Sequence, residues 1–386
     1  MPGADVMRVE PLSGIEYVDE LAAWRALESP DFPFFDYEFL RALERSGSIG
    51  EASGWSPVYL VCKDDQGCVL GALCLYLKTH SYGEYIFDWE WAHAYRQHGL
   101  PYYPKLVAAV PFTPATGPKL LVRPDAGVPW AAVTSALLDA AQRLGEERRV
   151  SSSHALFLPE EELDEFVEHG FAVRHSVQFH WHNRGYGAFS DYLDAMVSKR
   201  RRQVARERRQ LEGVEIERLT GNELSPEHAA TMYRFYLATS DRKWGSPYLT
   251  GEFFAEVFRT MGDRILLVLA RERGTGRPIA GALNFFKGRT LYGRYWGATE
   301  ERRNLHFELC YYQAIEFAIE RRLALFEAGA QGQHKLARGF LPSLTYSAHA
   351  IRHPEFKRAI ERYIAEEREL IAEDMQAYAS QDPYKR

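Results

Sequence analysis

The chain has 386 residues, 46% of them hydrophobic and 26% charged, and these globular values exclude a disordered, collagen-like or coiled-coil protein. Its length predicts about two or three domains. The 47 basic and 53 acidic residues leave a net charge of −6, which excludes a protein that binds nucleic acid through an overall positive charge.

The first half of the chain predicts helices that alternate with strands. Asp36 suits the N-cap of a helix that ends near Gly47. Apolar runs on either side of a turn predict a hairpin of residues 58–63 and 68–77. An aromatic segment at 85–103 is expected mainly to pack a core. The further elements are helices over 130–143 and 160–168 and strands over 153–158 and 171–182.

The second half predicts a similar alternation, which begins with one long helix over residues 189–211. The elements expected after it are strands over 214–219, 264–271, 278–286 and 291–296 and one ending at Glu327, with helices over 226–237, 251–260, 305–321 and from Pro354 onward. Together the two halves predict an α/β or α+β chain with mixed sheets.

An internal repeat relates the two halves. A shift of 210 residues places Gly71-Ala72-Leu73 on Gly281-Ala282-Leu283 and Tyr82-Gly83 on Tyr292-Gly293, with seven identities over the 31 positions from 58 to 88. Chance similarity between two hydrophobic hairpins is the alternative explanation. The equal spacing across the hairpin and the segment after it favours two copies of one fold.

The cysteines, at positions 62, 68, 74 and 310, have neither CxxC pairing nor zinc-site spacing, and the first three are expected to be small buried residues. The first residues include Asp5, Arg8 and Glu10 and form no apolar signal segment. Apolar runs such as 265–270 are too short to cross a bilayer. We therefore expect a reduced cytoplasmic protein without membrane insertion.

Several short stretches carry a resemblance to a known family. They are His80–Tyr85, Tyr102–Leu106, Pro111–Pro114, Gln178–Trp181, Tyr292–Gly297 and Glu327–Lys335. In these stretches, which span nearly the whole chain, the sequence resembles the FemAB-like family of peptidoglycan biosynthesis and recognition proteins. The order of elements in each copy resembles the GNAT acyltransferase fold. The resemblance implies two tandem GNAT-like (acyl-CoA N-acyltransferase) domains.

The junction of the two copies adds to this resemblance. Residues Ser198–Arg206, followed by Glu212–Ile216, are similar to the basic helix and strand that open the second FemAB-type domain. We therefore expect a first GNAT-like domain over residues 1–187 and a second over 188–386. The second would include a basic linker helix at 189–211 and the C-terminal helix.

The GNAT resemblance implies an active site where two parallel strands separate, here at residues 295–297 and 326–328, with Gly297 and Gly329 allowing a close backbone approach. Amine acylation requires an anchored donor, a stabilised oxyanion and a base. The candidate catalytic residues near these strand ends are Glu327, Glu308, His334, His306, Lys335 and Gln331.

Each candidate has an expected role. Glu327 or Glu308 is expected as general base, with His334 or His306 as alternates. Lys335 or Gln331 would anchor an oxyanion or a carboxylate. The purely structural alternative is that Glu327 pairs with Lys335 and that His306 hydrogen-bonds locally at a helix start.

Arg294, Arg302 and Arg303 are the candidates for donor or phosphate binding near this site. A CoA-dependent GNAT enzyme normally has a glycine-containing pyrophosphate loop at a helix N-terminus. The corresponding residues 300–306 contain no glycine and include two carboxylates. The donor therefore stays open between acyl-CoA and aminoacyl-tRNA, and no tightly bound cofactor is expected.

The basic segment 199–209 holds seven Lys or Arg residues and one Glu, so it carries +6 and leaves −12 for the rest of the chain. Its cations, Arg201 and Arg202 among them, cover more than one helical face. This pattern predicts a phosphate contact, with a tRNA acceptor stem or a nucleotide-linked lipid precursor. The alternative is a solvated helix whose cations pair with Glu207.

The sequence thus predicts an acyltransferase or aminoacyltransferase that modifies an amine, with a small molecule or a cell-wall precursor as acceptor. Two alternatives stay open: a non-catalytic binding protein for a cell-wall precursor or nucleotide, and a CoA-dependent N-acyltransferase for small molecules. His180 and His182 share a strand face, but no suitably spaced Cys or carboxylate accompanies them, so no metal site is expected.

Overall fold

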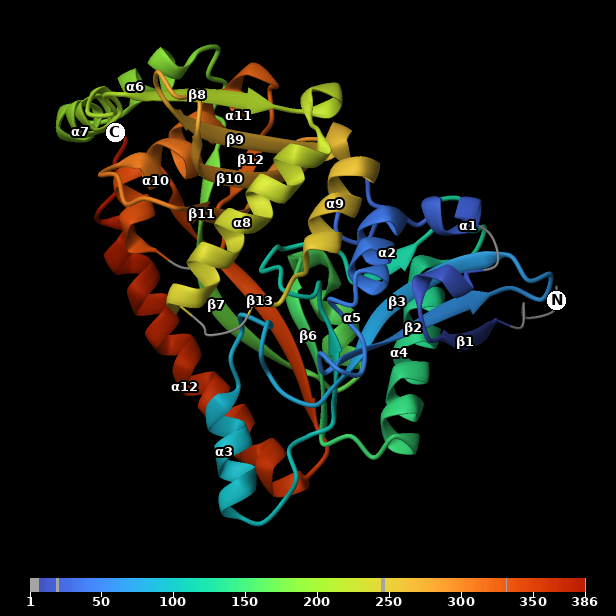
Figure 1. The fold of residues 1–386 in the computed structure, drawn as a ribbon. Helices are drawn as coiled ribbons and strands as arrows, with labels where there is room; N and C mark the ends of the chain where they lie inside the picture. The colour runs from blue at the N-terminus through green and yellow to red at the C-terminus, as the bar shows by residue number, and fades with distance from the viewer. Residues whose placement is uncertain (1–6, 19–20, 244–246, 331, 386) are drawn as a thin grey trace. The chain divides into compact units, whose positions relative to one another are not determined.

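The computed structural model describes residues 7–18, 21–243, 247–330 and 332–385. These residues form two compact units (Figure 1). The first contains the chain up to Ser29, Phe34–Ser176 and Leu344–Glu373; the second contains Pro30–Pro33, Val177–Ser343 and the chain from Asp374 onward. The expected domains, 1–187 and 188–386, divide the chain differently, because residues 344–373 pack with the first unit.

The first unit contains a mixed sheet in the order β1-β2-β3-β4-β6-β13, with β5 paired to β3. These strands are β1 Arg8–Leu12, β2 Trp55–Lys63, β3 Val69–Lys78, β4 Lys105–Ala108, β5 Leu120–Val122, β6 Ser152–Leu158 and β13 Leu341–Ile351. The β4–β6 pair is parallel, whereas β1–β2, β2–β3, β3–β4 and β6–β13 are antiparallel.

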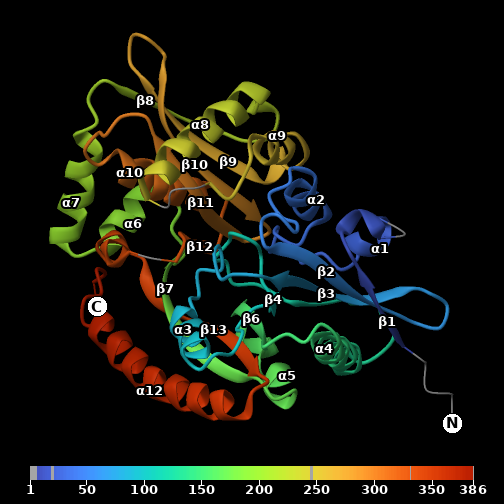
Figure 2. The ribbon, with the colours of Figure 1, turned by 60° about the horizontal axis from the view of Figure 1, so that its bottom comes forward.

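The helices of the first unit are α1 Leu21–Arg25, α2 Tyr37–Arg45, α3 Trp89–Gln97, α4 Trp130–Glu147, α5 Leu163–Glu168 and most of α12 Pro354–Ala379. Helix α4 packs on β2 and β3 because Val133, Leu137, Leu138 and Leu144 are buried at the spacing of one helical face. Helix α3 lies beside α12 in both views, where its Trp91 and Tyr95 join one apolar cluster (Figures 1 and 2).

The second unit contains a mixed sheet in the order β7-β12-β11-β10-β9-β8. Its strands are β7 Ala172–His182, β8 Val214–Leu219, β9 Ile265–Glu272, β10 Pro278–Lys287, β11 Thr290–Ala298 and β12 Leu325–Glu327. Only the part of β7 from Val177 onward belongs to the second unit. The β11–β12 pair is parallel, and the other pairs are antiparallel. The predicted strand 214–219 is confirmed at both ends.

The helices of the second unit are α6 Phe189–Ala195, α7 Ser198–Arg209, α8 Pro226–Lys243, α9 Gly251–Thr260, α10 Leu305–Phe307, the π-helix η5 Glu308–Tyr312, α11 Gln313–Glu320 and the 3-10 helix η6 Gln333–Arg338. Both ends of helix α9 agree with the predicted range 251–260. The prediction of one helix over 189–211 is wrong, because Met196 and Val197 have extended backbones that separate α6 from α7. Helix α7 is part of the second unit and buries Val204 and Glu207.

The repeat corresponds to the two hairpins but not to the segments after them. The shift of 210 residues maps β2 and β3 closely onto β9 and β10. In the second unit a two-residue turn at Gly288-Arg289 then leads into β11. In the first unit residues 79–104 intervene before β4, so Tyr82-Gly83 lies in a loop and Tyr292-Gly293 in a strand. That part of the expected repeat is wrong.

Two further sequence expectations need correction. Cys62 and Cys74 are buried as expected, but Cys68 is exposed, because it follows the hairpin turn. Strand β13 was not predicted, since its alternating small and polar residues give a weak strand pattern. Across the described ranges, none of the helices is both long and apolar enough to cross a membrane.

Candidate functional site

The parallel strands β11 and β12 separate at the place where the sequence predicted a cleft. They pair only from Thr290↔Leu325 to Tyr292↔Glu327. Beyond this point β11 continues to Ala298, whereas β12 ends at Glu327. A cavity of about 130 Å³ lies where they separate, lined by Gly293, Arg294, Tyr295, Trp296 and Ala328 together with residues of β10 and the 305–311 helical turn.

A β-bulge in β11 shapes this cavity. The register with β10 changes from Leu283↔Tyr295 to Asn284↔Gly293, which leaves Arg294 as the extra residue. A bulge interrupts the ladder and redirects a side chain, and Arg294 lines the cavity. Gly297 allows a close backbone approach, and the approaching segment is helix α8: a Cβ there would lie 1.9 Å from the Phe235 carbonyl oxygen.

A second, larger cavity of about 610 Å³ shares Trp296 and His306 with the first. Its remaining lining residues are Thr239, Ala298, Leu305, Glu300, Glu301, Arg302 and Arg303. The shared residues make the two cavities neighbours within the second unit. The larger cavity is lined by residues of α8, of β11 and of the segment that follows β11.

Lys335 is a buried amine near this cleft and close to Cys310, which lines the cavity. Its side chain is 1% exposed, and its Nζ donates a hydrogen bond of 2.7 Å to the carbonyl of Gly329, two residues beyond the end of β12. Burial lowers the pKa of Lys335 to about 7, although the nearby Cys310 thiol opposes this change. Near neutral pH the amine is therefore present in both protonation states.

His334 and His306 lie together beside the cavities. Their ring centroids are 6.2 Å apart, and both rings contact Tyr311. His334 Nε2 is 2.9 Å from the Tyr311 hydroxyl. Partial burial and the positive charges of Arg338 and Lys335 lower the pKa of His334, so its ring is neutral near pH 7 and can accept a proton.

The predicted acidic candidates differ in their surroundings. Glu327 is buried at the end of β12, opposite His180 of β7. Glu308 is also buried, but its Oε1 accepts hydrogen bonds from Arg208 at 3.1 Å and from Gln313 at 2.7 Å. These contacts make Glu308 an anchor for helix α7. Gln331 lies outside the described residues.

One of the arginines that were predicted to bind phosphate is already paired with carboxylates. Arg302 forms ion pairs with Glu272 at 3.3 Å and Glu300 at 3.2 Å. Arg303 is exposed and lines the larger cavity. Because Glu300 and Glu301 line the same cavity, it presents both signs of charge to a ligand.

Some of the cations of the basic helix α7 pair with other residues of the second unit. Arg201 pairs with Asp194 at 2.9 Å, and Arg202 Nε donates to the Ser198 carbonyl at 3.2 Å. Glu207 does not neutralise its helix neighbours, because it is paired with the buried Arg338 at 2.9 Å.

In the first unit a chain segment packs against the end of the corresponding strand pair. Strands β4 and β6 pair from Leu106↔Ser153 to Ala108↔Ala155, and the chain after β4 then folds back against β6. Gly117 N–H and Lys119 Nζ both donate to the Phe157 carbonyl, at 3.2 and 2.9 Å. The cavity beside β11 makes the second unit the candidate for binding a donor.

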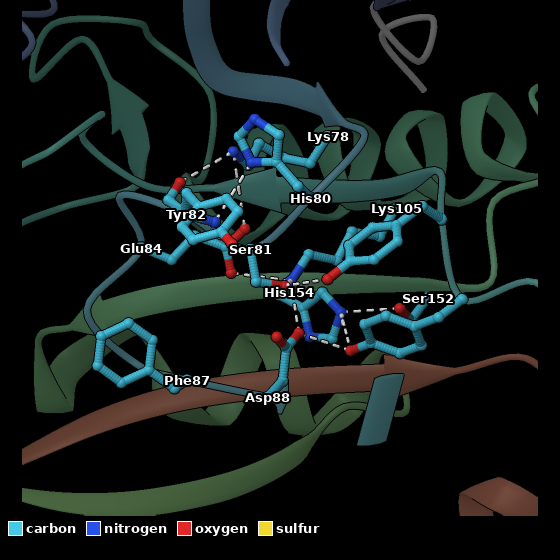
Figure 3. A network of polar contacts seen from close by, with 12 residues as sticks. Lys78, His80, Ser81, Tyr82, Glu84, Phe87, Asp88, Lys105, Ser152 and His154 are labelled. Carbon is cyan, nitrogen blue, oxygen red and sulfur yellow. Dashed lines mark hydrogen bonds and ion pairs between the residues drawn. The ribbon is translucent and has the colours of Figure 1, made fainter. Parts of the chain in front are cut away.

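The first unit instead contains a buried polar network that sequence reasoning missed (Figure 3). Lys78 and Lys105 lie opposite each other on β3 and β4, and both side chains are fully buried. Glu84 bridges them, with its oxygens 3.9 Å from Lys78 and 2.8 Å from Lys105. Asp88 completes the set with a short ion pair to Lys105. Two buried lysines thus face two buried acidic side chains.

Hydrogen bonds extend this network into β6 and β13. Tyr102 donates to Asp88 at 2.6 Å, and its hydroxyl lies 3.4 Å from His154 Nε2. His154 Nδ1 in turn lies 2.7 Å from His349 Nδ1. Burial is the main cause that lowers the pKa of His154 to about 3 and that of His349 well below its ordinary value, so this pair is uncharged at neutral pH.

The sequence and the fold were compared with those of known proteins. The model of the FemAB-like family, described as peptidoglycan biosynthesis/recognition, matches residues 15–386, and the chain belongs to this family. This result confirms the resemblance found in the sequence. No curated protein shows a significant sequence match.

Solved structures show a similar fold at low sequence identity. The crystal structure of FemX is 12% identical and has a TM-score of 0.55, with 91% of this chain and all of FemX covered. The C-terminal domain of a putative lysylphosphatidylglycerol synthetase from Agrobacterium fabrum is 8% identical, with a TM-score of 0.52 and coverage of 88% and 94%. A tandem GNAT protein from the clavulanic acid biosynthesis pathway is 15% identical, with a TM-score of 0.47 and coverage of 90% and 98%.

Proposed function

We propose that the chain is an acyltransferase that moves an acyl or aminoacyl group from a carrier to an amine, at the cleft between β11 and β12. The observation that carries the proposal is the cavity where these strands separate, with buried Lys335 hydrogen-bonded to the backbone that follows β12. Membership of the FemAB-like family supports the same reaction class. The proposed architecture is a tandem pair of GNAT-like domains, of which the second is catalytic.

The reaction has a simple atomic balance. A bond forms between the acceptor nitrogen and the donor carbonyl carbon, the bond from that carbon to the carrier's oxygen or sulfur breaks, and the amine loses a proton that the carrier gains. In its unprotonated form Lys335 accepts the proton; in its protonated form it stabilises the oxyanion. Neutral His334 is a second proton acceptor, and Tyr311 holds its ring.

The proposed donors are aminoacyl-tRNA and acyl-CoA, and the proposed acceptor is an amine of a cell-wall precursor in the cytoplasm. In an acyl-CoA complex, the pyrophosphate would contact Arg303 in the larger cavity. An aminoacyl-tRNA would bring its acceptor stem to helix α7, where Arg206 and Arg209 are exposed.

A thermal-shift comparison separates these donors, because a ligand of the native state raises the unfolding temperature. Coenzyme A, charged tRNA and a UDP-linked muropeptide would each be added to the wild-type protein and to the Arg303→Ala and Arg206→Ala variants. A shift with coenzyme A that Arg303→Ala removes identifies the CoA donor. A shift with tRNA that Arg206→Ala reduces identifies the tRNA donor. If none of the three ligands shifts the transition, the proposal fails.

A further inference from the structure

The helix η6, which carries Lys335, ends in a turn that closes on the backbone of Lys335 itself. The end is at Gly339, whose φ of 82° is the left-handed conformation that glycine favours. Gly339 N–H donates to the Leu336 carbonyl at 3.1 Å, and Phe340 N–H donates to the Lys335 carbonyl at 3.3 Å. These two bonds have the pattern of a Schellman motif, so the backbone of Lys335 is tied to residues 339 and 340.

Two tyrosine hydroxyls hold this helix end from other elements of the second unit. Tyr192 of α6 donates to the Arg338 carbonyl at 2.8 Å, and Tyr384 donates to the Gly339 carbonyl at 2.9 Å. Carbonyls at a helix end lack partners within the helix, and these hydroxyls supply them. A Cβ on residue 339 would lie 2.4 Å from the Tyr384 hydroxyl, so the glycine also permits this close contact.

The segment that carries Tyr384 is anchored in its turn. An antiparallel bridge pairs Tyr384 with Met196, at the extended junction between α6 and α7. Val197 N–H donates to the Pro383 carbonyl at 2.9 Å, and the Arg184 guanidinium lies 4.0 Å from the centre of the Tyr384 ring. Figures 1 and 2 show this end of the chain near α6. Tyr384 therefore contacts η6 from a fixed support within the same unit as the cleft.

Packing alone does not require the hydroxyl of Tyr384. The residue is only 4% exposed, and burying a hydroxyl is unfavourable unless it is hydrogen-bonded. A phenylalanine would fill the same space without this cost. The hydroxyl is directed at Gly339, next to the Phe340 N–H that binds the Lys335 carbonyl. The contact thus bears on the position of Lys335.

The amine of Lys335 is sensitive to a displacement of η6. Its Nζ donates to the Gly329 carbonyl, and the titratable groups that interact with it are Cys310 of η5, His334 of η6 and His180 of β7. Burial is the main cause that lowers the pKa of Lys335. Water that reached the amine would favour its protonated form and would raise this pKa.

We propose that Tyr384 is a positioning residue for Lys335: its hydroxyl holds the end of η6 so that the amine of Lys335 stays buried near the cleft between β11 and β12. The participation of Lys335 in transfer rests on the proposed function. The support that Tyr384 gives to the amine does not, because it is a property of the protein without a donor.

An NMR titration of the full chain, labelled with ¹³C-lysine, tests this role, and the Lys335 signal is identified by its absence from Lys335→Met. The wild-type amine should titrate with a pKa of about 7. Tyr384→Phe, which removes only the hydroxyl, should raise this pKa to about 7.5, and Tyr384→Ala should raise it above about 8. Thr260→Val is the matched control, because it removes a hydroxyl that donates to the Glu256 carbonyl at 2.8 Å on α9 of the same unit. It should leave the Lys335 titration unchanged.

Three results would overturn the proposal. They are a Lys335 titration in Tyr384→Phe and Tyr384→Ala equal to that of the wild type, an equal rise in Thr260→Val, and a wild-type amine that titrates near the ordinary value of about 10.4. If Tyr384→Ala does not fold, Tyr384→Phe decides the question.

Failure of the proposed function has a different signature, because the titration uses no donor. A protein that shows the expected titrations but transfers no acyl group would disprove the transfer reaction and leave the role of Tyr384 intact. Where transfer is observed, the acidic limb of its pH–rate profile should move to higher pH in Tyr384→Phe by the same amount as the Lys335 titration.

Discussion

Replacing Lys335 by Met should stabilise the protein while it removes transfer. Burial holds the pKa of Lys335 at about 7, compared with about 10.4 for an unfolded lysine. At 1.36 kcal/mol per pKa unit, this difference in pKa lowers the free energy of unfolding by on the order of 4 kcal/mol at pH 7. Losing its hydrogen bond to Gly329 costs about 1–2 kcal/mol. The Lys335→Met variant should therefore gain about 2–3 kcal/mol.

The pH dependence of this gain follows from the direction of the shift. The folded-state pKa of Lys335 is depressed, so the unfolded chain binds its proton more strongly between pH 7 and about 10.4. Wild-type stability is thus lost as pH falls through this range. The advantage of the variant should be largest at or below pH 7. Above about pH 10.4 it should reverse, because only the lost hydrogen bond, about 1–2 kcal/mol, then remains.

Thermal denaturation at several pH values measures this effect, and for a unit of this size a gain of 2–3 kcal/mol corresponds to a rise of about 4–12 °C. The matched control is Lys199→Met, which makes the same change at an exposed position of α7 in the same unit. A variant of Lys335 no more stable than the wild type at pH 7, or an advantage that does not shrink at high pH, would refute the reasoning.

Three further predictions test other parts of the structure. Arg338→Met leaves Glu207 buried without its ion pair and should cost about 3–5 kcal/mol in urea denaturation. Gly297→Ala brings a Cβ within 1.9 Å of the Phe235 carbonyl and should displace α8, at a cost of about 3 kcal/mol by the same measurement. Because the pKa of His154 is lowered to about 3, stability should fall by up to about 1.4 kcal/mol per pH unit below about 6.5, measured as amide exchange in β6.

Each of these predictions has a control or a contrary result. Arg201→Met, which breaks an exposed pair, should cost less than about 1 kcal/mol. Gly187→Ala places its Cβ 3.4 Å from Asp191 and should be tolerated. Exchange rates in β6 that reflect constant stability from pH 7 to about 4 would contradict the assignment of His154 as a buried neutral group.

The strands of the two hairpins could be predicted because apolar runs and tight turns are local signals. The 210-residue repeat correctly pairs β2–β3 with β9–β10 for this reason. The identity of Tyr82-Gly83 and Tyr292-Gly293 misled the prediction, because an insertion after β3 places a loop where the second unit has a strand. The break between α6 and α7 was missed because Met196 and Val197 have no strong helix-breaking character.

Part of the geometry of the candidate site could be predicted. The strand separation followed from the family resemblance and the glycines near it, and the structure brings Lys335, His334, His306 and Arg294 to the same region. The ion pairs of Glu308 and Arg302 could not be predicted, because their partners are distant in sequence.

The buried network of the first unit had one readable signal. Lys78 ends an otherwise apolar strand, and Lys105 precedes another apolar run. A lysine in such a position is rarely buried without a partner. This pattern indicates carboxylates nearby, and the structure supplies Glu84 and Asp88.

Transfer of a labelled acyl group tests the central claim most directly. Charged tRNA and acyl-CoA would be offered with amine acceptors, including a UDP-linked muropeptide, to the wild-type protein and to the Lys335→Met and Lys199→Met variants. We expect label to reach the amine with the wild-type and Lys199→Met proteins and to be reduced at least 100-fold with folded Lys335→Met. Transfer undiminished in Lys335→Met, or absent from the wild type with every donor, would contradict the assignment of the cleft between β11 and β12 as an acyltransferase site.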